Sequence, residues 1–232
     1  MKNNIEVEIC TFSLESCLNA QLAGASRVEL CSGMYDGGTT PSAAMIRMAR
    51  EKLSIQLYVM IRPRGGDFLY SDLEFEVMKE DIRFAKECRV DGVVLGILNA
   101  DGSVDVQRTR ELVELAAPLK VTFHRAIDMT RNMEEALEGI IQAGCYRVLT
   151  SGGRNTVSEG MEQIKALVEQ AKGRVQIMAG SGVNAANANT LIELGVDAIH
   201  LSGKSSRDSE MEFRNPNVFM GGVSGLPEYE QY

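Results

Sequence analysis

The sequence predicts a parallel (β/α)₈ barrel of the TIM type, in a single domain that spans residues 1–232. Short apolar runs alternate with longer segments whose apolar residues recur at helical spacing, and the runs follow one another at a mean spacing of roughly 28 residues. Several helical segments enter the next run through a short turn with Gly or Asp, as at Val90–Gly92 and Leu194–Asp197, which is typical of a helix end that leads into a strand. A doubly wound sheet is the alternative, but it usually has fewer strands and a glycine fingerprint after the first, where this chain has Cys10–Ser13.

The predicted strands are short and rich in β-branched and aliphatic residues: Ile5–Ile9, Arg27–Cys31, Gln56–Ile61, Gly92–Leu95, Lys120–His124, Arg147–Thr150, Val175–Ala179 and Ala198–Leu201. The predicted helices carry an apolar stripe: Ser13–Ala23, Ser42–Lys52, Ser71–Cys88, Asp105–Ala117, Asn132–Ala143, Val157–Ala171 and Ala185–Leu194. Ser202–Tyr232 has many Gly, Asn and Pro residues and no strong stripe. We therefore expect the final helix of the barrel to be absent or atypical.

Composition excludes several classes of protein. Hydrophobic residues make up 44% of the chain and charged residues 24%, which argues against disorder. The net charge of −8 argues against a nucleic-acid partner, and no apolar run approaches the roughly 18 residues of a membrane span. The chain start has no signal-peptide pattern, and the five cysteines form no C-x-x-C pair. These features predict reduced thiols in a cytoplasmic protein; the oligomeric state stays open, with a homo-oligomer among the alternatives.

Strand alternation predicts carboxylates and thiols inside the barrel. Glu8 and Cys10 share one face of the first strand, and Glu29 and Cys31 share one face of the second, with aliphatic residues opposite. Buried carboxylates need cationic partners, so we expect them to pair with the cations after strands three and five: Arg62, Arg64, His124 and Arg125. Such a cluster is either a structural plug of ion pairs or a ligand cleft, because barrel sites lie at the C-terminal ends of the strands.

The loop after the third strand, Ile61–Ser71, is the most informative segment. Arg62 and Arg64 flank a proline, and their guanidinium groups suit carboxylate or phosphate oxygens. Asp67 can orient an arginine, although a structural Arg–Asp pair in a tight loop is the alternative. His124 is a candidate acid or base beside Asp128 or Glu29; the alternative is a histidine satisfied in the core.

Glycine-rich turns follow three late strands, at 150–153, 179–183 and 201–204. Barrel enzymes often bind phosphate in the loops after strands seven and eight, and free amides with small hydroxyls suit that role. Glycine also simply makes turns, so each motif alone is weak. The predicted anion-binding positions in these turns are Ser151, Gly152, Gly180, Ser181 and Gly182.

Cys10 and Cys31 end neighbouring strands at matching positions. Two thiolates so placed are suited to a soft ion such as Cu(I). The alternative is that both are small buried hydrophobic residues, as free cysteines commonly are.

The same segments resemble the motifs of the CutC family. They occur in the family's order and cover nearly the whole barrel: Glu8–Cys10, Arg27–Cys31, Gly37–Ser42, Ile61–Phe68, Phe123–Ala126, Leu149–Gly152 and Met178–Gly182. The resemblance implies a TIM-type barrel, a cytoplasmic location and a role in copper homeostasis, with Cys10 and Cys31 as copper ligands. The chain is expected to stop short of the family's final helix.

Two functions follow from the sequence. The first is a copper homeostasis protein that binds Cu(I) through Cys10 and Cys31. The second is an uncharacterised enzyme that acts on a small anionic or phosphorylated substrate at the barrel mouth. Its candidate catalytic residues are Glu8, Glu29, His124 and Asp67, and its candidate anion-binding side chains include Arg62, Arg64 and Arg125.

Overall fold

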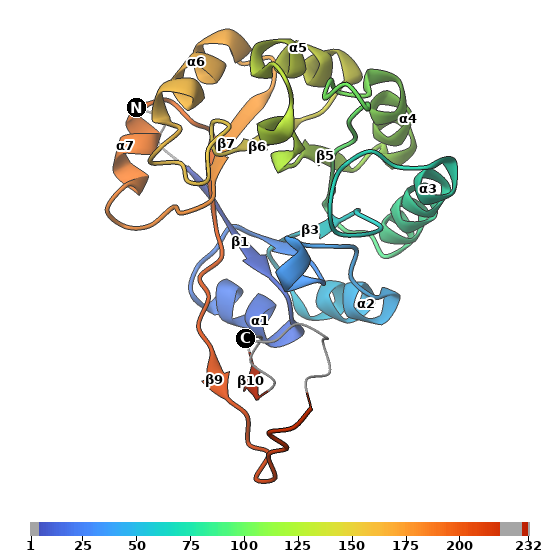
Figure 1. Cartoon of the computed structure of the whole chain (residues 1–232), viewed down its shortest axis with the longest axis vertical. Helices are drawn as coiled ribbons and strands as arrows, with labels where there is room; N and C mark the ends of the chain where they lie inside the picture. Colours follow the sequence, from blue (N-terminus) through green and yellow to red (C-terminus); the bar gives the residue numbers. More distant parts are fainter. Residues whose placement is uncertain (1–4, 219–228, 232) are drawn as a thin grey trace. The chain divides into compact units, whose positions relative to one another are not determined.

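The computed structural model describes residues 5–218 and 229–231 (Figure 1). Contacts divide the chain into two compact units, Met1–Ser202 and Gly203–Tyr232, so that a single domain over 1–232 stays a prediction. In the first unit eight parallel strands close into a barrel in sequence order, and the last strand pairs with the first. The predicted (β/α)₈ barrel is confirmed. Its strands are β1 (Glu6–Thr11), β2 (Arg27–Leu30), β3 (Gln56–Met60), β4 (Gly92–Leu95), β5 (Lys120–Phe123), β6 (Arg147–Thr150), β7 (Gln176–Gly180) and β8 (Ala198–Leu201).

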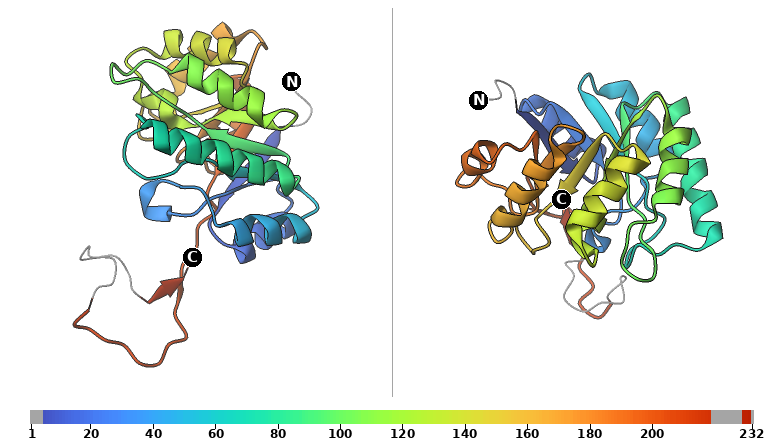
Figure 2. Two further views of the ribbon diagram at one scale, coloured as in Figure 1. Left: turned by 90° about the vertical axis from the view of Figure 1, so that its right-hand side faces the viewer. Right: turned by 90° about the horizontal axis from the view of Figure 1, so that it is seen from above.

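Helices lie outside the ring of strands (Figure 2). They are α1 (Leu14–Leu22), α2 (Ala43–Lys52), α3 (Asp72–Glu87), α4 (Val106–Ala116), α5 (Met133–Ala143), α6 (Met161–Ala171) and α7 (Ala188–Glu193), with short 3₁₀ helices η1 (Met34–Asp36) and η2 (Arg125–Met129). Ser13 and Ser42 cap α1 and α2, since the side chain of each accepts a hydrogen bond from a backbone amide of the first turn. No described helix is long and apolar enough to cross a bilayer.

Helix α6 begins at Met161, later than the predicted Val157. The residues between them form a turn that packs tightly on the strand end before it. A Cβ atom on Gly160 would lie 1.9 Å from the carbonyl oxygen of Ser151, so only glycine fits there. The residue that directly precedes α6 is therefore restricted to glycine.

The main core lies between the strands and the helices. Val28 and Leu30 of β2 belong to it, and both are fully buried. Because successive side chains of a strand point to opposite faces, the alternate residues Arg27 and Glu29 face the barrel interior. Pairing of β1 with β2 sets Glu8 beside Arg27, and pairing of β1 with β8 sets Glu8 beside His200. Two small apolar clusters fill other parts of the interior: Cys31, Tyr58, Met60 and Val94, and Leu149, Met178 and Ala198.

The second unit contains little regular structure among its described residues. β9 (Arg207–Asp208) pairs antiparallel with β10 (Glu230–Gln231). No helix occurs in residues 202–218 or 229–231, in line with the expected lack of a regular final helix. Residues 219–228 of the predicted atypical segment lie outside the described part of the chain.

Candidate metal centre and ligand pocket

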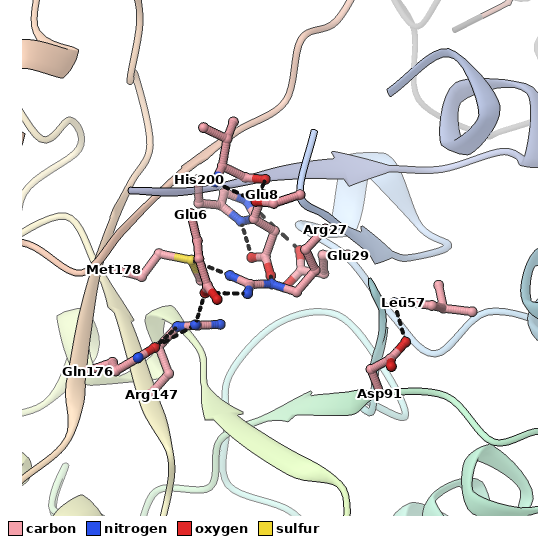
Figure 3. A network of polar contacts seen from close by, with 12 residues as sticks. Glu6, Glu8, Arg27, Glu29, Leu57, Asp91, Arg147, Gln176, Met178 and His200 are labelled. Atoms are coloured by element: carbon pink, nitrogen blue, oxygen red, sulfur yellow. Dashed lines mark hydrogen bonds and ion pairs between the residues drawn. The ribbon is translucent and has the colours of Figure 1, made fainter. Parts of the chain in front are cut away.

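An ionic layer crosses the N-terminal half of the barrel interior (Figure 3). We use this name for Glu6, Glu8, Arg27 and Arg147. The buried Arg27 donates from Nη1 to Glu6 at 2.8 Å and from Nε to Glu8, and Arg147 also donates to Glu6. Arg27 additionally lies 4.7 Å from the centre of the Tyr58 ring. The expectation that the strand carboxylates pair with Arg62, Arg64 or Arg125 is therefore wrong for Glu8, because the neighbouring strand already supplies an arginine in register.

His200 links the ionic layer to the mouth. Its Nδ1 atom lies 2.7 Å from Oε1 of Glu8, and its Nε2 atom lies 3.9 Å from Oε2 of Glu29. Our sequence analysis missed His200. Strand parity was the available signal, because Ala198 and His200 share a face of β8, and closure of the barrel brings that face beside β1.

The two cysteines predicted to meet do so. Sγ of Cys10 lies 4.0 Å from Sγ of Cys31, and the Cys31 thiol lies 3.5 Å from Oε2 of Glu29. Cys31 is buried, whereas Cys10 is partly exposed to the mouth. Two sets of side chains bring ligand atoms within 4.8 Å of one another: Cys10, Glu29 and Cys31, and Glu8, Glu29 and His200. We call the five residues of these two sets the thiol–histidine cluster.

Contacts within the cluster shift the pKa values of its two thiols in opposite directions. The hydrogen bond with Cys31 and the contact with His200 outweigh burial and lower the pKa of Cys10 to about 5. The same thiol–thiol contact, together with burial, raises the pKa of Cys31 well above its usual value. Burial and the charge on Cys10 raise the pKa of Glu29 well above the ordinary carboxyl range. The opposite pKa shifts of the two thiols assign the thiolate to Cys10 rather than to Cys31.

Charges across the strands hold the histidine in place. Burial alone would lower the pKa of His200, but Glu29, Cys10 and Glu8 raise it well above the ordinary value. Burial would raise the pKa of Glu8, yet the hydrogen bond from His200 and the charge of Arg27 lower it to about 2. Glu8 is thus a buried carboxylate that orients His200, and it is unsuited to be a general base.

A pocket of about 700 Å³ opens at the C-terminal ends of the strands. We call it the mouth pocket. Cys10, Glu29 and His200 of the thiol–histidine cluster lie in its wall, together with Arg62 and His124. The sequence places Glu8, Glu29, Arg62 and His124 among the residues of one candidate ligand cleft. Glu29, Arg62 and His124 do share this pocket, whereas Glu8 does not line it and contacts Nδ1 of His200. The other residues of the wall are Asp36, Gly37, Met60, Gly66, Asp67, Phe68, Leu69, Leu98, Asn99, Ala100, Gly102, Arg125, Asp128, Met129 and Leu149.

His124 presents a single nitrogen without a partner. Its Nδ1 atom accepts a hydrogen bond from the Ala126 amide at 3.2 Å, and its buried Nε2 atom has none. Burial and the nearby charge of Arg62 lower the pKa of His124 to about 3, so the ring is neutral and Nε2 carries the hydrogen. The sequence had suggested Asp128 or Glu29 as the partner of the His124 ring. The Ala126 amide is the partner instead, and it sets this tautomer. The ring fits because position 96 is glycine, where a Cβ atom would lie 2.6 Å from it.

The two arginines of the loop after β3 have different surroundings. Arg62 is buried and donates to the carbonyl oxygens of Asp36, Gly38 and Gly66 at 2.6 to 2.8 Å. Arg64 donates to Glu74 at 2.5 Å and to Asp67 at 2.9 Å, and it is not among the residues that line the mouth pocket. Asp67 lies in the pocket wall but is mostly exposed and bound to Arg64.

The glycine-rich turn after β6 binds a carboxylate of the protein itself, that of Asp128. Asp128 accepts hydrogen bonds from the Thr150 hydroxyl at 2.6 Å and from the amides of Ser151 and Gly153 at 3.0 Å. Nε of Arg125 donates to the same carboxylate at 2.8 Å. The donors expected to hold a bound phosphate after β6 are therefore already occupied.

The turn after β7 does not reach the mouth pocket either. The Ser181 hydroxyl donates to the carbonyl oxygen of Asn155 at 2.6 Å. Gly180 packs closely, since a Cβ atom there would lie 2.6 Å from Leu149. None of the five positions predicted in these turns lines the mouth pocket: Ser151, Gly152, Gly180, Ser181 and Gly182.

The closed parallel barrel and its polar cluster at the strand ends define a TIM-barrel protein with a pocket at the C-terminal face. The CutC family profile matches residues 5–205. A copper homeostasis protein cutC homolog of Mus musculus is 48% identical over 98% of this chain and 84% of its own length, and a family protein CutC of Bacteroides fragilis is 48% identical over 100% of this chain and 92% of its own. A CutC crystal structure from Streptococcus agalactiae superposes with a TM-score of 0.81 at 37% identity and covers 86% of this chain and 99% of its own. The chain belongs to the CutC family.

Proposed function

We propose that this protein binds Cu(I) as a copper homeostasis protein, with Cys10 and Cys31 as the ligands. The observation that carries the proposal is the pair of sulfur atoms 4.0 Å apart at the edge of an open pocket. One ion with bonds of about 2.3 Å to each sulfur spans such a distance, since bonds of this length are usual between a metal and a thiolate. Thiolate sulfur is also the donor that Cu(I) prefers.

The surroundings of the thiols support a metal ligand over a packing role. The pKa of Cys10, at about 5, makes it a thiolate at neutral pH, so that a metal ion does not have to displace a proton from it. Glu29 supplies a third possible ligand atom within 4.8 Å of both sulfurs. The names of the curated relatives refer to copper homeostasis. Free thiols and Cu(I) both require reducing conditions, so the proposal includes a cytoplasmic location.

An anaerobic competition titration against a chromogenic Cu(I) chelator tests the ligands. We expect the Cys10→Ser/Cys31→Ser variant to lose at least about tenfold in affinity, because serine oxygen is a poor ligand for a soft ion. Cys88→Ser is the matched control, since Cys88 is a partly exposed free cysteine outside the thiol–histidine cluster. Equal affinity of the double variant and the wild type would refute the assignment.

The second candidate is an enzyme that acts on a small anionic substrate in the mouth pocket. What favours it is a buried cation in the pocket wall, Arg62, together with the unpartnered Nε2 atom of His124. Neither group is needed by two thiolates that hold copper.

A further inference from the structure

Arg62 carries a buried charge without a carboxylate partner. The residue is 4% exposed, and its hydrogen-bond acceptors are three backbone carbonyl oxygens. Within residues 5–218 and 229–231, no carboxylate oxygen lies within 4.0 Å of its guanidinium group. Carbonyl oxygens accept hydrogen bonds from Nη1 and Nη2, and the buried Nε atom has no partner. Carbonyl dipoles do not neutralise the charge, and a buried charge is costly unless it is paired. An anion in the mouth pocket would remove that cost.

His124 supplies a donor beside this charge. Phe68 joins the two residues, since its ring centre lies 5.0 Å from the Arg62 guanidinium carbon and 4.9 Å from the His124 ring centre. All three residues line the mouth pocket. The free Nε2–H of a neutral imidazole donates one hydrogen bond and accepts none. A ligand oxygen there accepts a hydrogen bond and also lies in the field of a full positive charge.

We propose that the mouth pocket binds the carboxylate of a small organic acid, which accepts a hydrogen bond from Nε2 of His124 and neutralises the charge of Arg62. This proposal does not rest on copper binding, because its residues are not members of the thiol–histidine cluster. It narrows the anionic substrate of the second candidate function to one class.

A carboxylate fits the pocket better than a phosphate, because the other cationic and amide donors nearby already have carboxylate partners. Arg64 is bound to Glu74 and Asp67, and Arg125 is bound to Asp128. The amides after β6, which would suit phosphate oxygens, hold Asp128 instead. One charge and one N–H match the single charge of a carboxylate better than the oxygens and higher charge of a phosphate.

Part of the remaining pocket wall is apolar and can accommodate a hydrocarbon group. Met60, Phe68, Leu98, Met129 and Leu149 contribute side chains to it. A volume of about 700 Å³ lies within the usual range for small-molecule sites and exceeds what a single inorganic ion fills. The acid is therefore expected to carry a hydrocarbon portion.

Benzoate, benzamide and inorganic phosphate are suitable probes, compared by calorimetric titration at constant ionic strength. Benzoate and benzamide share a ring and differ in charge. We expect benzoate to bind at least about tenfold more tightly than benzamide, in keeping with a charge-assisted hydrogen bond, and phosphate not to displace it. Equal binding of benzoate and benzamide, displacement by phosphate, or no binding of benzoate would each overturn the proposal.

Two variants of His124 locate the contact without disturbing Arg62, whose loss could unfold the loops it holds. His124→Leu removes the donor, and His124→Gln places an amide N–H near the position of Nε2. We expect His124→Leu to weaken benzoate binding by about tenfold and His124→Gln to recover most of that loss. Folding of both is checked by circular dichroism. Benzoate affinity that is unchanged in a folded His124→Leu protein would also overturn the proposal.

Discussion

In the ionic layer, Arg27 and Glu8 have a partner for every polar side-chain atom, and Arg147 leaves one buried nitrogen without a partner. In the mouth pocket, Glu29, Arg62 and His124 each keep one buried polar atom without a partner. Both regions are built from side chains that point into the same barrel. The difference follows the direction of the strands, since Glu8 and Arg27 lie nearer their N-terminal ends and His124 follows the C-terminal end of β5. In barrels of this type the C-terminal face binds ligands and the other end contributes stability.

Breaking the ionic layer should give the largest effect on stability. We expect Arg27→Met to lower the free energy of unfolding by about 3–5 kcal/mol, because Glu8 would remain charged, buried and without its guanidinium partner. Urea unfolding followed by circular dichroism measures the change. Arg174→Ala, which removes an exposed ion pair with Glu138, is the control and should change the midpoint little. A similar small effect of both substitutions would remove the contrast between the two regions.

A smaller effect of pH is expected from the mouth pocket. His124 has a pKa of about 3 in the folded protein, against about 6.5 in an unfolded chain. Between these values the unfolded chain binds more protons, so the free energy of unfolding falls as the pH drops below 6.5. From pH 6.5 to pH 5 this contribution amounts to about 2 kcal/mol.

Comparison with His124→Gln isolates that contribution, since Gln does not titrate and His200 is present in both proteins. Urea unfolding at pH 6.5 and at pH 5 should show a steeper loss of stability in the wild type than in the variant. A parallel loss in both would mean that His124 has the same pKa in the folded and the unfolded protein. The folded protein would then carry a protonated His124 at pH 5, and the Nε2–H group could not be assigned to a neutral ring.

The barrel could be predicted from sequence because its signals repeat. Apolar runs at regular spacing gave all eight strands of the barrel, and alternation within Glu6–Cys10 and Arg27–Cys31 placed Glu29 and the two thiols at one mouth. Pairing across the barrel was harder, because it depends on which strands are neighbours. His200 was missed for this reason, although the closure of β8 on β1 places it beside Glu8.

The glycine-rich turns show a second limit of sequence reasoning. Thr150–Gly153 has the amides and hydroxyls of an anion site, and it does hold a carboxylate, but that carboxylate is Asp128 of the same chain. Sequence pattern identifies donors without revealing whether an internal acceptor already satisfies them. The same holds for Arg64, which already forms ion pairs with Asp67 and Glu74.

X-ray absorption at the copper edge tests the proposed copper centre most directly. The protein is loaded anaerobically with one equivalent of Cu(I), and the neighbours of copper are counted in the wild type and in Cys10→Ser/Cys31→Ser. The wild type should show two sulfur neighbours, because Cys10 and Cys31 lie 4.0 Å apart and Cys10 faces the mouth pocket; the variant should show none. Only nitrogen and oxygen neighbours in the wild type, or two sulfurs that persist in the variant, would contradict the assignment of these two cysteines.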